Sequence, residues 1–185
     1  MSEVDAIPAP TEAAAPPSKA ARFVDGVLKR CQQDKGLAAR LRRADNPSTE
    51  YQSWELLAAY NIDLEKSYER LPYAAVGSAM SRAKAERNGS MKLGQAIARC
   101  YDDGQESAQA KAKLRRLLAC SDTGEACRIL RGILTLIASR VSPPLDYARL
   151  LTQLLRFHWQ PEKIKAQWAQ EFYGRNSESA VKEHA

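Results

Sequence analysis

Residues 90–141 of this 185-residue chain read SMKLGQAIARCYDDGQESAQAKAKLRRLLACSDTGEACRILRGILTLIASRV. At about 3.6 residues per turn, this stretch predicts three successive helices, each with basic side chains beside or opposite an apolar stripe. The last of them, from about Thr123 to Val141, is the most informative. It places Arg128 and Arg131 opposite its apolar residues, which are Leu130, Ile133, Leu134, Ile137 and Val141. The stretch therefore predicts a helix with one buried face and one basic face.

The other residues on the basic face of this helix are small or polar, among them Gly132, Thr135 and Ser139. Small residues would let a phosphate backbone come close, and the planar fork of an arginine can hold two phosphate oxygens. A solvated face of an ordinary packed helix gives the same pattern. This helix alone does not decide between the two interpretations.

The first half of the chain also has a helical pattern. Residues 1–18 are rich in Ala and Pro and carry only acidic charges, so we expect a flexible tail there. Helices follow over residues 19–43, interrupted at Gly36, and after Ser48, where Trp54 and Leu57 stand at core spacing. Pro72 predicts a break or a new helix start in the next helical run.

In the second half, helices are expected to begin at Leu93 and to run from Ser107 to Cys120 and from Pro161 to Gly174. Another helix is expected after Asp146, which would be its N-cap. Residues 175–185 should fray. No strand-like alternation is present. The sequence therefore predicts an all-α fold of two small helical bundles, forming an elongated two-lobed subunit. The expected lobes are residues 19–89 and 90–174, divided near the basic loop at residues 84–92.

Composition limits the classes of protein that this chain can belong to. A hydrophobic content of 44% is enough for a core, and a net charge of +6 favours an anionic partner such as nucleic acid, an acidic protein or a membrane surface. No apolar run approaches the ~20 residues that a membrane helix needs. The four cysteines form no C-x-x-C pair, and no secretory signal is present. We expect a cytoplasmic protein with free thiols.

Residues that could support catalysis are few. His158 and His184 are the only histidines, and Asp102 and Asp103 precede Gly104 as a turn would. There is no phosphate-binding glycine loop, and two cysteines seven residues apart with one nearby histidine make no zinc site. The sequence predicts a non-enzyme that holds no metal and no cofactor.

Basic residues instead gather in three places. They are the Arg40/Arg42/Arg43 cluster, the loop with Lys84, Arg87 and Lys92, and the helix pair with Arg115, Arg116, Arg128 and Arg131. If these clusters share a face, they form a track that binds phosphates without reading bases. Each cluster alone also fits a solvated surface. The aromatic residues stand mostly at core spacing, which argues against base stacking as the main mode of binding.

The order of five short strings carries a family resemblance. They are SMKLGQAIARC, KLRRLLAC, EACRILRGIL, PLDYARLLTQLLRFHW and KAQWAQEFYG. In this order they resemble the CasB family, the small subunit of the type I-E CRISPR surveillance complex, Cascade. The similarity covers residues 22–174 and is strongest from Leu93 onward.

The resemblance implies an all-helical, non-catalytic subunit, present as a pair in the assembly. Its partners would be CRISPR RNA, target DNA, other Cascade subunits and a second copy of itself, with no membrane contact. Its role would be to stabilise the R-loop, in which base pairing reads the target and proteins hold the backbones. The family's basic positions fall on Arg42, Arg43, Lys92, Arg99, Arg128 and Arg131, with Arg115 and Arg116 on its basic helix.

Two other functions remain open at this point. The chain could be a protein–protein scaffold whose basic faces dock acidic partners. It could also be a free-standing DNA-binding regulator, although the helix with Arg128 and Arg131 is too apolar around its circumference to suit a major groove.

Overall fold

The predicted all-α fold is confirmed. A computed structural model describes residues 16–174, and within these residues the chain forms nine α-helices, two short 3₁₀ turns and no strand. An isolated parallel bridge joins Met91 to Leu145. The tails expected at residues 1–18 and 175–185 lie outside the described residues, except for residues 16–18.

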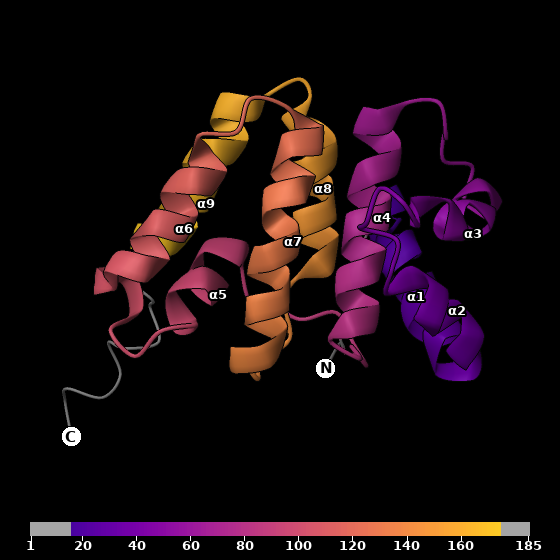
Figure 1. Ribbon diagram of the computed structural model, residues 1–185, viewed down its shortest axis with the longest axis horizontal. Helices are drawn as coiled ribbons and strands as arrows, with labels where there is room; N and C mark the ends of the chain where they lie inside the picture. Colours follow the sequence, from indigo (N-terminus) through magenta and orange to yellow (C-terminus); the bar gives the residue numbers. More distant parts are fainter. Residues whose placement is uncertain (1–15, 175–185) are drawn as a thin grey trace, which may run out of the picture.

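The helices stand side by side along the long axis of the molecule (Figure 1). At one end lie α1 (Lys19–Gln33), α2 (Lys35–Leu41) and α3 (Trp54–Ala59), followed by α4 (Ser67–Arg82). The middle holds α7 (Thr123–Arg140) and α8 (Tyr147–Phe157). The other end holds α5 (Leu93–Arg99), α6 (Ala108–Leu118) and α9 (Pro161–Tyr173). The 3₁₀ turns at Glu50–Ser53 and Gly104–Glu106 precede α3 and α6.

Side-chain caps begin several of these helices. Asp122 accepts from the amide of Glu125 over 2.8 Å, and Asp146, predicted as a cap, accepts from the amide of Arg149 over 3.0 Å. Each carboxylate satisfies an amide that has no partner inside the helix, which sets the first residue of the helix. Ser18, Asp34 and Ser107 cap α1, α2 and α6 in the same way.

The core is built around α4, which is buried on all sides over residues 72–81. It packs against α1 and α2 on one side and against α7 and α8 on the other. The buried apolar residues form one cluster with members from α1 to α9. The division into lobes at residues 19–89 and 90–174 stays a prediction from the sequence.

Three local predictions in the first half of the chain are wrong. Pro72 lies inside a continuous α4, because one lost hydrogen bond in the second turn is offset by burial of the ring. Trp54 is 40% exposed, with the guanidinium of Arg70 5.7 Å from its ring centroid. Leu57 is buried as predicted, and Leu56 is buried beside it in place of Trp54. The break between α1 and α2 falls at Asp34 rather than at Gly36, because the Asp34 carboxylate caps α2.

The segment between α4 and α5 is fixed to the start of α8. The side-chain oxygen of Asn88 accepts from the amides of Tyr147 and Ala148, over 2.8 and 3.2 Å. The side-chain nitrogen of Asn88 donates to Asp146 over 3.0 Å. Asn88 therefore completes the N-terminus of a helix that is distant in the sequence.

Among the described residues, no helix is both long and apolar enough to cross a membrane.

Candidate nucleic-acid interface

The face of α7 that carries Arg128 and Arg131 is exposed, as the helical pattern predicts. Both arginines and Gly132 lie at the surface, while the predicted apolar residues on the opposite side are buried, except for Val141, which follows the end of the helix and is half-buried. A Cβ added to Gly132 would meet nothing within 4 Å. Because no side chain covers the helix at this point, a bulky polyanion can approach its backbone closely.

The end of α2 is held against α4, and this fixes the position of the first basic cluster. The carbonyl of Arg42 accepts from the hydroxyl of Ser78 over 3.1 Å and from Nη2 of Arg82 over 3.2 Å. Both donors belong to α4. The side chains of Arg42 and Arg43 are exposed beside this contact.

Asp45 joins this cluster to α7. Nη2 of Arg82 donates to Oδ2 of Asp45 over 2.8 Å, and Nε of Arg131 lies 3.5 Å from Oδ1. Nη1 of Arg82 also donates to the hydroxyl of Thr135 on α7 over 3.2 Å. The end of α2, the end of α4 and the exposed face of α7 therefore form one connected surface.

A hollow of about 320 Å³ opens next to Asp45. Its apolar lining includes Leu71, Ala74 and Ala75 of α4, and Arg128 and Arg131 also line it. A second ion pair lies in the hollow, where Nε of Arg70 donates to Oε1 of Glu50 over 2.5 Å. Both acids in this hollow are thus matched by arginines other than Arg128.

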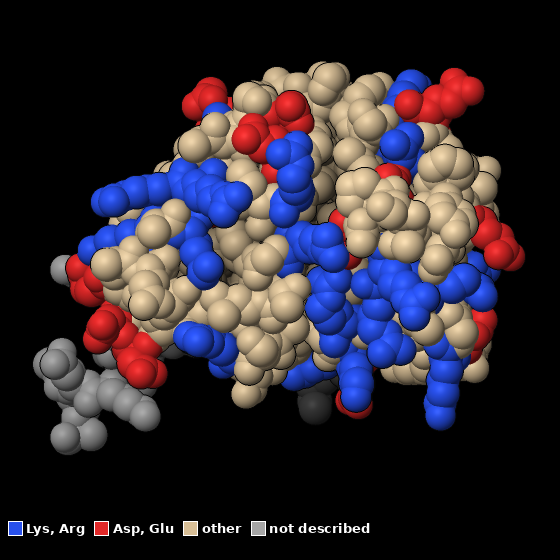
Figure 2. All heavy atoms as spheres, viewed as in Figure 1, with Lys and Arg blue, Asp and Glu red and all other residues tan. Residues whose placement is uncertain are grey.

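Seen from this side, the basic side chains form two groups (Figure 2). One group covers the region where α2, α4 and α7 meet, and the other lies over α6 at the opposite end. Arg115 and Arg116 are exposed on α6. Mostly uncharged surface lies between the two groups, so the predicted track is interrupted on this face.

The remaining predicted residues lie elsewhere. Lys92 and Arg99 are exposed at the two ends of α5. Lys84 and Arg87 line a different hollow of about 450 Å³, together with Arg140 at the C-terminal end of α7. The structure thus gathers Arg42, Arg43, Arg128 and Arg131 around Asp45, while the other candidates lie on α5, on α6 and in the hollow beside Arg140.

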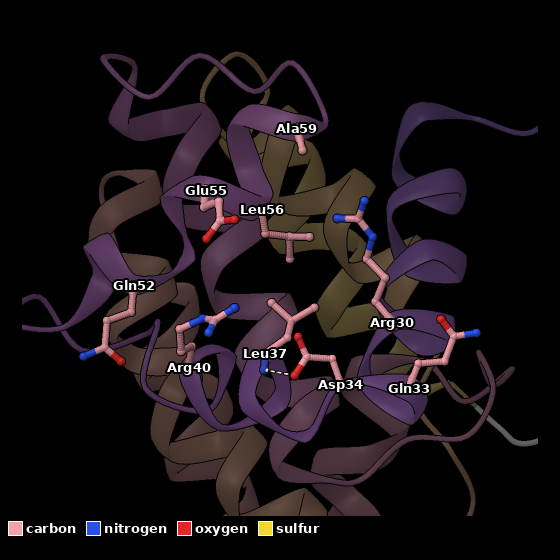
Figure 3. Close-up of a pocket in the computed structure, with 9 residues that line it drawn as sticks. All are labelled: Arg30, Gln33, Asp34, Leu37, Arg40, Gln52, Glu55, Leu56 and Ala59. Carbon is pink, nitrogen blue, oxygen red and sulfur yellow. Dashed lines mark hydrogen bonds between the residues drawn. The ribbon is translucent and has the colours of Figure 1, made fainter.

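A third hollow, of about 330 Å³, lies between α3 and the bend that joins α1 to α2 (Figure 3). Leu37 and Leu56 lie between Arg30 and Arg40. Asp34 and Glu55 also line it, so its charges are balanced. This balance distinguishes it from the basic surface around α7.

Sequence reasoning missed two residues at the centre of the site, Arg82 and Asp45. Arg82 was not part of any basic cluster in the sequence, and Asp45 is an acid next to Arg42 and Arg43. The only signal for Arg82 was its place at the C-terminal end of a helix with Ser78 and Ser81, small residues that let another segment approach.

The groups weighed for catalysis or metal binding differ in exposure, since His158, Asp102 and Asp103 are exposed and Cys127 is buried. His158 stacks on Tyr68 with ring centroids 4.1 Å apart, and His184 lies outside the described residues. Burial raises the pKa of the Cys127 thiol well above its usual range, so the thiol stays protonated. No three potential metal ligands cluster within residues 16–174.

Comparison with known proteins identifies the family. The model of the CRISPR-associated protein Cse2 family matches residues 37–173. A CRISPR-associated protein Cse2 from Thermus thermophilus is 28% identical over 99 residues, which are 53% of this chain and 56% of that protein. This match thus spans little more than half the length of the relative.

Solved structures extend the likeness over more of the chain. The crystal structure of CasB from Thermus thermophilus superimposes with a TM-score of 0.64 at 25% identity, covering 84% of this chain and 98% of that one. A chain of a CRISPR RNA-guided surveillance complex shares the fold, with a TM-score of 0.65 at 22% identity over 84% of this chain and 91% of its own. The resemblance to CasB is confirmed, and the chain belongs to the CRISPR-associated protein Cse2 family.

Proposed function

We propose that this chain is a non-catalytic, nucleic-acid-binding subunit of a type I-E CRISPR surveillance complex in the cytoplasm. It stabilises the R-loop by holding the phosphates of the guide–target heteroduplex and of the displaced strand. Its partners are CRISPR RNA, target DNA, other subunits of the complex and a second copy of the chain. Membership of the Cse2 family, and the shared fold with a chain of a CRISPR RNA-guided surveillance complex, support the proposal.

The observation that carries the proposal is the exposed basic surface where α2, α4 and α7 meet. Arg128 and Arg131 stand beside the uncovered backbone of Gly132, and Arg42 and Arg43 lie at the end of α2. Arginines hold phosphates through two parallel hydrogen bonds, and such contacts carry no sequence information. The surface therefore suits a partner whose sequence is read by base pairing. Lys92, Arg99, Arg115 and Arg116 complete the proposed set of binding residues.

Binding of the purified chain to labelled single-stranded DNA, duplex DNA and an RNA–DNA hybrid, at several salt concentrations, tests the proposal. We expect sequence-indifferent binding that weakens steeply with salt, because each phosphate contact releases counterions. Replacing Arg128 and Arg131 with alanine should reduce the logarithmic salt slope by about 2, one for each lost contact. The matched control replaces Arg22 and Lys29, which are exposed on α1, with alanine. Its logarithmic salt slope should stay closer to that of the original chain.

Equal slopes for the two double variants would contradict the proposed surface. If the chain bound none of the three probes even at low salt but bound an acidic partner protein, the scaffold function would replace the proposed one.

A further inference from the structure

A buried carboxylate lies in the middle of the basic surface. The side chain of Asp45 is 5% exposed, and it contacts Arg82 of α4 and Arg131 of α7. An acid in this position lowers the net positive charge that a polyanion meets. Its presence calls for a physical explanation, because a charge taken out of water is costly unless it is well paired.

Arg82 is the structural partner of this carboxylate. Its side chain is 23% exposed, and its guanidinium donates to the Asp45 carboxylate, to the Arg42 carbonyl and to the hydroxyls of Ser78 and Thr135. Three of these bonds share the two hydrogens of Nη2, and the fourth comes from Nη1. Contacts with the end of α2, with Asp45 and with α7 therefore fix the position of the Arg82 guanidinium.

Arg131 contacts the same carboxylate in a different way. Its side chain is 45% exposed, and its Nε lies 3.5 Å from Oδ1 of Asp45, which is too long for a good hydrogen bond. This Oδ1 is buried and accepts no hydrogen bond from residues 16–174. Asp45 thus draws one edge of the guanidinium inward, while nearly half of the side chain stays open to solvent.

We propose that Asp45 is a positioning residue, which holds the guanidinium of Arg131 ready for a phosphate of the bound strand. The inference rests on the proposed function. A free arginine side chain has many rotamers, and fixing one of them before binding removes part of the entropic cost of binding. The carboxylate therefore strengthens the binding of an anion, although its charge has the wrong sign.

Positioning and simple charge predict opposite effects for Asp45→Asn, which removes the charge with little change in shape. If Asp45 only repels phosphates, the variant binds labelled single-stranded DNA more tightly. If Asp45 positions Arg131, the variant binds about two- to tenfold more weakly, the range expected for releasing one long side chain. Asp45→Glu, which restores the carboxylate, should recover part of the loss. Glu125→Gln is the charge control, because it removes one negative charge from α7, the helix that carries Arg131. This variant should bind as tightly as the original chain or more tightly.

A second measurement separates positioning from a merely structural role. In an Arg131→Ala background, Asp45→Asn should cause no further loss, because the side chain that it positions is gone. An equal loss with and without Arg131 would overturn the inference, and so would tighter binding by Asp45→Asn alone.

Arg131→Lys covers the case in which Asp45→Asn does not fold, because it changes only a surface side chain. Lysine keeps the charge but lacks the Nε edge, so we expect binding weaker than that of the original chain and tighter than that of Arg131→Ala. Binding equal to that of the original chain would overturn the inference. The outcomes that overturn this inference are all seen in variants of a chain that binds. If the proposed function itself is wrong, the original chain binds none of the probes.

Discussion

The amide of Gly94 in α5 donates to Oε2 of Glu171 in α9 over 3.3 Å, at a point where the two helix backbones touch. A Cβ on residue 94 would lie 2.4 Å from the amide nitrogen of Phe172 and 2.5 Å from the carbonyl oxygen of Trp168. The other oxygen of Glu171 accepts from Nε of Arg149 over 2.9 Å and from Gln153 over 3.0 Å. This buried contact ties together α5, α8 and α9.

Gly94→Ala is therefore expected to destabilise the fold by about 3 kcal/mol, because the backbone of α9 must move away to admit the methyl group. Urea unfolding followed by circular dichroism measures the change. Gly132→Ala is the matched control, since Gly132 also lies in a helix but has open space around it. That variant should be more stable by about 0.5–1 kcal/mol, because alanine favours the helix. Similar effects of the two substitutions would contradict the close approach of α5 and α9.

Arg82→Ala should destabilise the chain by about 3 kcal/mol, because it leaves the buried carboxylate of Asp45 without its hydrogen-bonding partner. Adding Asp45→Ala to this variant should recover part of the loss, since the unpaired charge is then removed. A double-mutant cycle by urea unfolding gives the coupling energy. If the losses of unfolding free energy in the two single variants simply add in the double variant, the contact between Arg82 and Asp45 contributes little to stability. Arg115→Ala, at an exposed position on α6, should change stability by less than about 0.5 kcal/mol.

Stability should decrease at alkaline pH because of two buried tyrosines. Burial raises the pKa of Tyr73 and of Tyr147 to about 12, against about 10 in an unfolded chain. The unfolded state therefore loses these protons first, so their contribution is fully present below about pH 10 and is lost as the pH rises towards 12. Tyr147→Phe should flatten this decrease in urea unfolding across the range. Tyr51→Phe, at a side chain that is 59% exposed, should leave the decrease as it is.

The two groups of basic side chains should contribute separately to nucleic-acid binding. Replacing Arg115 and Arg116 with alanine removes two charges from α6, at a distance from the surface around Asp45. If both groups touch the same strand, replacing either this pair or the Arg128/Arg131 pair should reduce the salt slope by about 2. On a long strand, the effects of the two replacements should add. A short oligonucleotide that reaches only one group should respond to only one pair. Effects of both pairs on the binding of the short oligonucleotide would argue against separate groups.

Periodic patterns in the sequence were enough to predict most of the helices. Apart from Val141, the stripe on α7 is buried as predicted, and so is the one on α9, with Ile164, Trp168 and Phe172, because both helices are long enough for the periodicity to define one face. Trp54 was placed wrongly because α3 has only six residues, too few for periodicity to determine which side faces the core.

The candidate site could be predicted only in part. The exposure of Arg128 and Arg131 follows from the pattern of one helix. The contact between Asp45 and Arg82 joins residues 37 positions apart and depends on how the end of α2 packs on α4. No local pattern records such a contact, so the acid at the centre of the basic surface was not foreseen.

The capping of α8 by Asn88 has a consequence for the order in which the chain folds. An isolated helix of 11 residues is marginal in water, and the amide of Ala148 gains its acceptor only when Asn88, 60 positions earlier, arrives. Closing so long a loop costs entropy before any contact offsets it. We therefore expect the first turn of α8 to become protected from hydrogen exchange late in refolding, together with the segment around Asn88 rather than with its neighbours in the sequence.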